Sequence, residues 1–254
     1  MVLLRYIATV IPALSAAAAL ELVFAFPRQI IFWGLAWLII TLVVHALLCG
    51  REIRSPSFWQ FAIPPITLFV TAAAYSLLIQ SPVVRHLLAI VLAVLLFAIY
   101  WNLYIFIYQP VRYLPHSLEH LSVLCNLLAV FFGATGLFGL RTYLGLNALT
   151  IVALAFAGSA LLVQQSFWVS KLKFRDTAPY LLIIPLLESE AAAALYGLPV
   201  GYATSGAVFT LSYYCLLGMV RRSLRGTYTR ASAWRYAIVT LGGVALVFFS
   251  AKWF

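Results

Sequence analysis

Charged side chains are scarce in this sequence. Lys and Arg together number 16 and Asp and Glu only 6, so that 9% of the 254 residues are charged while 65% are hydrophobic. A water-soluble domain of this size needs more polar residues than this to cover its surface. The composition therefore excludes a soluble globular protein and predicts a multi-pass integral membrane protein.

Cysteines, long loops and nucleotide-binding glycine motifs are also scarce or missing. The three cysteines, Cys49, Cys125 and Cys215, fall in separate hydrophobic segments without paired spacing, which argues against a disulfide framework or a thiolate metal site. The connections between hydrophobic segments are short and leave no room for an extramembrane domain. We therefore expect residues 1–254 to form a single integral membrane domain.

The hydrophobic segments have the length of transmembrane helices. A helix needs about 20 apolar residues to cross the hydrocarbon, and it satisfies its own backbone groups there. The sequence predicts an all-α transmembrane helix bundle with nine spans. Their ranges are 5–26, 30–49, 57–80, 84–108, 117–139, 144–167, 179–196, 200–220 and 235–252.

Two of these spans leave alternatives open. Only the stretch Tyr196–Pro199 separates the seventh span from the eighth, so the two are alternatively a re-entrant pair or one broken helix, which gives eight spans. The first span resembles a signal peptide around its small residues, but its apolar stretch continues to Phe26, which favours a retained helix.

The distribution of positive charge predicts the orientation. With the N-terminus inside, the cytoplasmic segments hold twelve of the Lys and Arg residues: Arg5, Arg51, Arg54, Arg112, Lys171, Lys173, Arg175, Arg221, Arg222, Arg225, Arg230 and Arg235. The other side holds four: Arg28, Arg85, Arg141 and Lys252. The positive-inside rule then predicts a cytoplasmic N-terminus and an outside C-terminus in a plasma membrane or bacterial inner membrane.

The net charge of +10 needs no nucleic acid to explain it. It is concentrated in the predicted cytoplasmic loops 170–176 and 221–235, where each cation attracts anionic lipid by about 1 kcal/mol. We expect membrane lipids as partners, with anionic headgroups at 221–235. Membrane protein partners are a further possibility for this loop.

Two carboxylates in the seventh span are the strongest functional candidates. Ionisable groups inside a bilayer are energetically unfavourable, and Glu188 and Glu190 fall near mid-helix. On a regular helix they point about 200° apart, so both face one cavity only if the helix unwinds. Pro185 and Gly197 are candidates for shaping such a break. Carboxylates on a broken helix are typical of cation and proton sites in transporters. The alternative is a pair of protonated glutamic acids that only form hydrogen bonds with neighbouring backbone groups.

The start of the fifth span has the pattern His116-Ser-Leu-Glu119-His120. Two histidines one turn apart can hold zinc, and the glutamate between them can act as a general base. A third ligand would come from Glu188 or Glu190. The alternative is that these residues only cap a helix start, where a glutamate favours the positive end of the helix dipole.

A second polar group is predicted in the cytoplasmic half. His45 late in the second span and Asn102 in the fourth share a depth with His116 and His120. Such a cluster suits a solute vestibule, and a pair of its histidines suits a b-type haem. Histidines near the interface also commonly do no more than form hydrogen bonds.

These patterns support three functions. The leading one is a permease-like protein that handles a small solute, ion or lipid at Glu188 and Glu190, without catalysis and without a cofactor. The alternative is a structural or scaffold subunit of a larger membrane assembly, in which the carboxylates bind partner helices. The third is an intramembrane metal-dependent enzyme that uses His116, Glu119 and His120.

Overall fold

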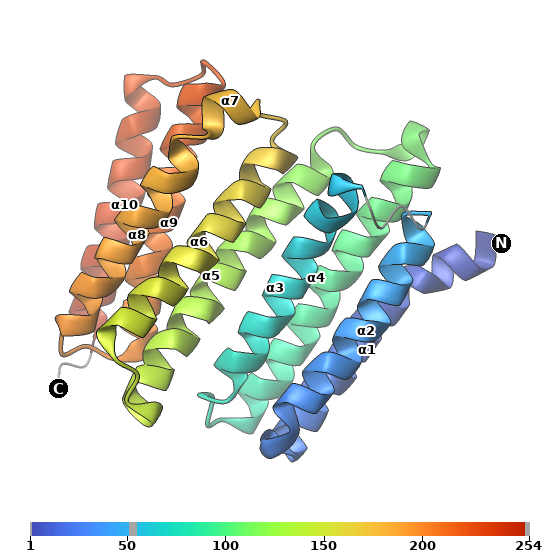
Figure 1. Cartoon of the computed structure of the whole chain (residues 1–254), viewed down its shortest axis with the longest axis horizontal. Helices are drawn as coiled ribbons and strands as arrows, with labels where there is room; N and C mark the ends of the chain where they lie inside the picture. Colours follow the sequence, from blue (N-terminus) through green and yellow to red (C-terminus); the bar gives the residue numbers. More distant parts are fainter. Residues whose placement is uncertain (1, 51–54, 252–254) are drawn as a thin grey trace. The chain divides into compact units, whose positions relative to one another are not determined.

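A computed structural model describes residues 2–50 and 55–251 of the chain (Figure 1). Over these ranges all the long elements are helices, and no strand occurs. Three cations that enter the orientation prediction, Arg51, Arg54 and Lys252, lie outside the described residues.

Nine of the described helices are long and apolar enough to cross a membrane. They are α1 (Val2–Ala25), α2 (Ile30–Leu48), α3 (Pro56–Ser76), α4 (Pro82–Tyr108), α5 (Ser117–Leu144), α6 (Ala148–Val169), α8 (Tyr180–Gly197), α9 (Tyr202–Leu224) and α10 (Arg230–Ser250). Three short elements accompany them: η1 (Pro27–Gln29), η2 (Pro110–Arg112) and α7 (Phe174–Thr177). The predicted nine-span helical architecture is confirmed for the described chain, and the nine helices indicate a multi-pass membrane protein.

The seventh and eighth spans are separate helices. Residues 198–201 connect α8 to α9, so the described chain does not form the single broken helix of the alternative prediction. The predicted break at Pro185 is also absent, since α8 continues through this residue. Proline removes one helical N–H donor, which here would serve the carbonyl of Leu181 in the first turn of α8. One missing bond this close to the helix start leaves the rest of α8 intact, and the chain leaves the helix only after Gly197.

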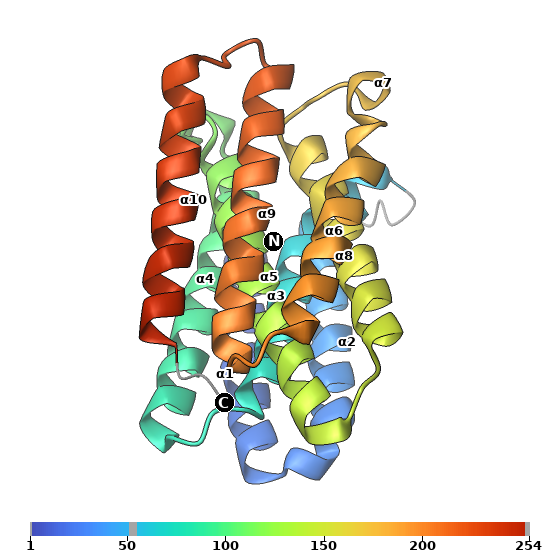
Figure 2. The same cartoon turned by 90° about the vertical axis from the view of Figure 1, so that its left-hand side faces the viewer.

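The described chain divides into two compact units, Met1–Ala129 and Val130–Phe254, with the boundary inside α5. In the first unit α1 packs against α4 and α2, and α3 contacts α2 and α4 (Figure 1). In the second unit α8 packs against α6 and α9, and α10 packs along α9 (Figure 2). Each unit is therefore a small helix bundle.

An aromatic pair fixes the first unit at the contact of α1, α2 and α3. The ring of Trp37 on α2 stacks on Phe69 of α3 with centroids 3.8 Å apart. The indole Nε1–H of Trp37 donates to the Pro12 carbonyl of α1 at 3.1 Å. Ala16 of α1 and Ala72 of α3 are fully buried, so small side chains allow the close helix approach that is typical of membrane bundles.

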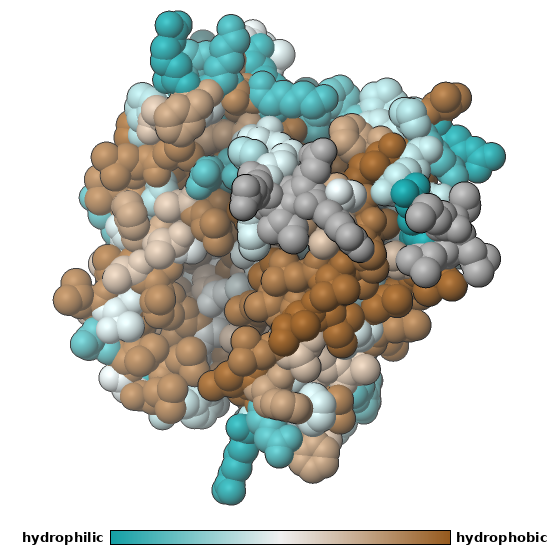
Figure 3. Space-filling model, turned by 45° about the vertical axis from the view of Figure 1, so that its right-hand side comes forward, coloured by the Kyte–Doolittle hydropathy of each residue, from teal (hydrophilic) through white to brown (hydrophobic). Residues whose placement is uncertain are grey.

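The outer faces of the helices are apolar, as contact with lipid requires. Many large hydrophobic side chains are exposed, among them Ile31, Val83 and Leu149, each about three-quarters exposed. Figure 3 shows hydrophobic residues gathered over the middle of the visible face, with hydrophilic residues mainly along its upper edge and some at its lower end. In water such a surface would cause aggregation, whereas in a bilayer it is in contact with the lipid tails.

The second unit contains a close helix contact that yields a stability prediction. A Cβ atom on Gly206 of α9 would lie 2.8 Å from the backbone nitrogen of Thr135 on α5 and would also meet its side-chain oxygen. We expect Gly206→Ala to destabilise the protein by about 1–3 kcal/mol, because the backbone of α5 has to move away. The melting temperature in detergent measures this loss.

The matched control is Gly158→Ala on α6, where a Cβ atom would have no neighbour within 4 Å. This variant is expected to keep or slightly raise the melting temperature, because alanine favours the helix over glycine. Equal melting temperatures for Gly206→Ala and the wild type would contradict the close contact of α9 with α5.

Candidate functional site

Glu188 is a fully buried carboxylate near the middle of α8. The hydroxyl of Ser212 on α9 lies 2.9 Å from its Oε1 and 3.1 Å from its Oε2. Among the described residues no Lys, Arg or His forms an ion pair with Glu188. A buried carboxyl group therefore has a hydroxyl, rather than a cation, as its hydrogen-bonding partner.

The Ser212 hydroxyl has more acceptors than it has protons. Its Oγ lies 2.8 Å from the backbone carbonyl of Phe209 in addition to the two oxygens of Glu188. A hydroxyl donates a single hydrogen bond and accepts others. When Glu188 is ionised, Ser212 can donate to it; when Glu188 is protonated, Glu188 can donate to Ser212, which then donates to Phe209. The geometry accommodates both protonation states without moving a backbone atom.

Two further polar side chains from neighbouring helices complete the surroundings of Glu188. Tyr213 of α9 and Ser166 of α6 are both fully buried. We call Ser166, Glu188, Ser212 and Tyr213 the Glu188 cluster. It draws on α6, α8 and α9 and lies wholly within the second unit.

The structure does not bring Glu190 into this cluster. Because α8 is continuous, Glu190 points away from Glu188 and is exposed on the surface of the unit. Pro185 is buried about one turn before Glu188, while Gly197 is exposed at the end of the helix. Sequence reasoning missed Ser166, Ser212 and Tyr213, although hydroxyl groups within hydrophobic spans are a signal that can be searched for.

The His116-x-x-Glu119-His120 segment lies at the start of α5. The Nδ1 of His116 is 3.0 Å from Oε2 of Glu119, and the two histidine rings lie 6.5 Å apart. Glu119 occupies the first turn of the helix, where its charge complements the helix dipole. Within the described ranges, no group of three or more His, Cys, Asp or Glu side chains is arranged to hold a metal ion. The zinc enzyme stays a prediction, testable by metal analysis of the wild type and His120→Ala.

His45 is fully buried and hydrogen-bonded to the backbone. Its Nε2 lies 2.9 Å from the carbonyl of Phe58, so this nitrogen carries the proton and donates. The ring meets Phe58 and Tyr100 edge-on, with centroids 4.6 and 6.0 Å away. In this structure the Nε2 of His45 is therefore engaged by a backbone carbonyl, and the b-type haem stays a prediction, testable by an optical spectrum of the purified protein. Asn102 is half-buried and donates to the carbonyl of Ala98 in its own helix.

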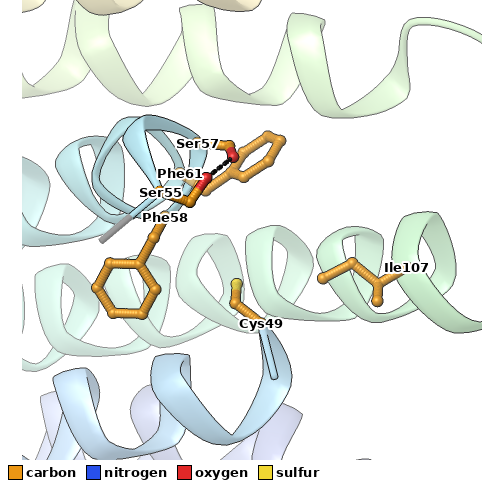
Figure 4. A pocket seen from close by; sticks show the side chains of 6 residues that line it. All are labelled: Cys49, Ser55, Ser57, Phe58, Phe61 and Ile107. Carbon is orange, nitrogen blue, oxygen red and sulfur yellow. Dashed lines mark hydrogen bonds between the residues drawn. The ribbon is translucent and has the colours of Figure 1, made fainter. Parts of the chain in front are cut away.

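A pocket of about 280 Å³ lies beside His45 in the first unit (Figure 4). Its lining comes from the end of α2, the start of α3 and the last turn of α4, and consists of Cys49, Ser55, Ser57, Phe58, Phe61 and Ile107. The Sγ of Cys49 lies 3.6 Å from Nε2 of His45. These lining side chains bear no charge, so the pocket offers hydroxyl, thiol and aromatic contacts.

The basic segment 221–235 joins α9 to α10. Arg225 donates to the carbonyl of Ser170 at 3.4 Å, and Arg222 donates to the hydroxyl of Tyr236 at 3.3 Å. Arg230 and Arg235 are exposed at the start of α10. The connection between α9 and α10 lies at one end of this helix pair (Figure 2), so the arginines of the segment are concentrated at that end.

Comparison with known proteins gives no assignment. No protein-family model, no curated protein and no solved structure matches this chain.

The hydrogen bond of His45 generates a second stability prediction. We expect His45→Leu to destabilise the protein by about 1–3 kcal/mol, because a buried polar contact to the Phe58 carbonyl is lost. Thermal unfolding in detergent measures the effect. His86→Leu is the matched control, since His86 pairs with Glu21 at 2.7 Å on an exposed surface and such pairs contribute about 1 kcal/mol or less. Equal losses in the two variants would contradict a structural role for His45.

Proposed function

We propose that this membrane protein binds a proton or a small monovalent cation at Glu188 and carries it, alone or with a solute, across the bilayer. The supporting observation is the single Ser212 hydroxyl within hydrogen-bonding distance of both Glu188 oxygens and of the Phe209 carbonyl. In such a site Glu188 can take up or release a proton while the Ser212 hydroxyl turns between the carboxylate and the Phe209 carbonyl. It is permease-like and includes no catalytic step.

The depth of the site supports the same proposal. Glu188 lies near the centre of an 18-residue helix, where an ionisable group is unfavourable unless it has a role. Transporters place their coupling-ion sites near the bilayer midplane. The oxygens of Glu188 and Ser212 are hard donors of the type that alkali cations prefer. Glu190 lies outside this site and has no part in the proposed binding.

The proposal includes the orientation and the location of the protein. With the N-terminus in the cytoplasm and the C-terminus outside, segment 221–235 faces the anionic lipid headgroups of the inner leaflet. A plasma membrane or a bacterial inner membrane has this charge asymmetry. Reporter fusions at the two termini test the orientation, which is overturned if both termini lie on the same side.

Flux measurements test the role of Glu188. The purified protein is reconstituted into vesicles that contain a pH-sensitive dye, with Na⁺ or K⁺ as the other cation and an imposed membrane potential. We expect the wild type to accelerate the flux of the proton or of one of these cations. Glu188→Gln is expected to abolish the flux, because the amide has the same shape but cannot ionise. Ser212→Ala is expected to weaken it about tenfold, through loss of one hydrogen bond to a charged group.

Glu190→Gln is the matched control, because it makes the same substitution two residues away on the exposed side of α8. This variant is expected to keep the wild-type flux. Equal loss in the two glutamine variants, with normal yield and melting temperature, would show that burial of Glu188 does not define the site. Wild-type vesicles without flux of any of the three ions would overturn the proposal itself.

The scaffold subunit is the second candidate, and the exposed Glu190 favours it. A carboxylate on an outer face suits contact with another membrane protein rather than with lipid. The two functions are separable, because a scaffold requires Glu190 and its partner helix whereas cation binding requires Glu188.

A further inference from the structure

An unpaired carboxylate faces outward from the middle of α8. Glu190 lies about 10 Å from the nearer end of the helix, at a rise of 1.5 Å per residue, and its side chain is exposed. Among the described residues it forms neither a hydrogen bond nor an ion pair. Lipid tails offer no donor or counter-charge, so contact with hydrocarbon alone leaves this group unsatisfied.

The surroundings of Glu190 on this face suit a helix. Ile183, Leu186, Glu190, Ala193 and Gly197 are all exposed and repeat at intervals of three and four residues, the spacing of a helix–helix seam. The side chains before Glu190 are large and those after it are small. Small residues let a second backbone approach closely, which brings its polar groups within reach of the carboxylate.

The chain itself offers no cation at the depth of Glu190. The described Lys and Arg residues that belong to the long helices all lie within about two turns of a helix end: Arg5, Arg85, Arg141, Arg221, Arg222, Arg230 and Arg235. A second copy of this chain would therefore place another carboxylate, and no described cation, against Glu190. Charge complementarity thus favours a different protein as the occupant of this face.

We infer that the α8 face around Glu190 binds a transmembrane helix of another protein, whose Lys or Arg lies at the same membrane depth. The ion pair satisfies two charges that are each unfavourable alone in hydrocarbon. The small residues Ala193 and Gly197 allow the contact that the ion pair requires. The inference is independent of the proton or cation site at Glu188, which faces the interior of the unit.

A model peptide tests this inference without knowledge of the natural partner. The full chain, labelled with a fluorophore at its C-terminus, is reconstituted into lipid vesicles with a labelled Leu/Ala helix of about 22 residues. One peptide has a central Lys and the other has Leu at this position. Energy transfer measures association. We expect the Lys peptide to bind about tenfold more tightly than the Leu peptide, and Glu190→Gln to remove this preference.

A second variant moves the carboxylate along α8. It tests the inference by a change in peptide preference and not by a loss of binding. The double variant Glu190→Leu with Leu186→Glu shifts the carboxylate by about 6 Å, one turn along the same exposed face. We expect it to prefer a peptide whose Lys is displaced by four residues in one of the two directions. Glu21→Gln, at the end of α1, removes a carboxylate elsewhere and is expected to leave the preference for the central-Lys peptide unchanged.

Three results would overturn the inference. The first is equal binding of the Lys and Leu peptides to the wild type, and the second is a Lys preference that persists in Glu190→Gln. The third is energy transfer between copies of the chain that Glu190→Gln abolishes, which would identify a second copy as the occupant. Flux through Glu188 is measured separately, so failure of either proposal leaves the other standing.

Discussion

Lipid does not hydrogen-bond to protein, and this constraint shapes every polar feature of the chain. Backbone groups are satisfied within helices, and the side-chain hydroxyls of Thr67, Thr71 and Ser189 donate to carbonyls of their own helix. Trp37 and His45 reach carbonyls of neighbouring helices instead. Polar groups that are satisfied in these ways contribute to packing and need no functional explanation. The polar side chains that are not satisfied by a backbone carbonyl are therefore the ones that indicate function.

Glu188 is buried and Glu190 is exposed because of the helical period alone. Two residues along a continuous α8 rotate the side chain by about 200°, which turns one carboxylate into the bundle and the other out of it. Glu188 is hydrogen-bonded to the Ser212 hydroxyl of α9 and, among the described residues, forms no ion pair, which is the basis of the proposal that it binds a proton or a small cation. Glu190 forms no hydrogen bond or ion pair with the described residues. The two proposals therefore assign an internal ligand to one glutamate and an external partner to the other.

The helices were predictable because hydrophobic length is a local property. The nine predicted spans agree with the structure to within a few residues at most ends, and α8 and α9 are separate as the nine-span prediction requires. Pro185 misled the prediction because a proline near a helix start removes a bond that the helix can spare. The opposite directions of Glu188 and Glu190 followed from the helical period.

The partners of the polar groups were not predictable, because they depend on which helices pack together. Nothing in the sequence pairs Ser212 with Glu188, which are 24 residues apart, or His45 with the carbonyl of Phe58. In a soluble protein the apolar side of each helix would identify its buried face, but lipid makes the outside of this bundle as apolar as its inside. For the same reason the sequence did not show which of two neighbouring glutamates is buried.

The peripheral position of α10 has a consequence for handling the protein. This helix begins with a reciprocal cap between Thr229 and Ser232, so its first turn is fixed without help from neighbours. Over its described length Ser232 is its one buried residue, and its bulky side chains, such as Phe249, point outward. The annulus of lipid or detergent therefore supplies most of its solvation. When short-chain detergent strips that annulus, α10 is the long helix with the smallest buried share to retain it.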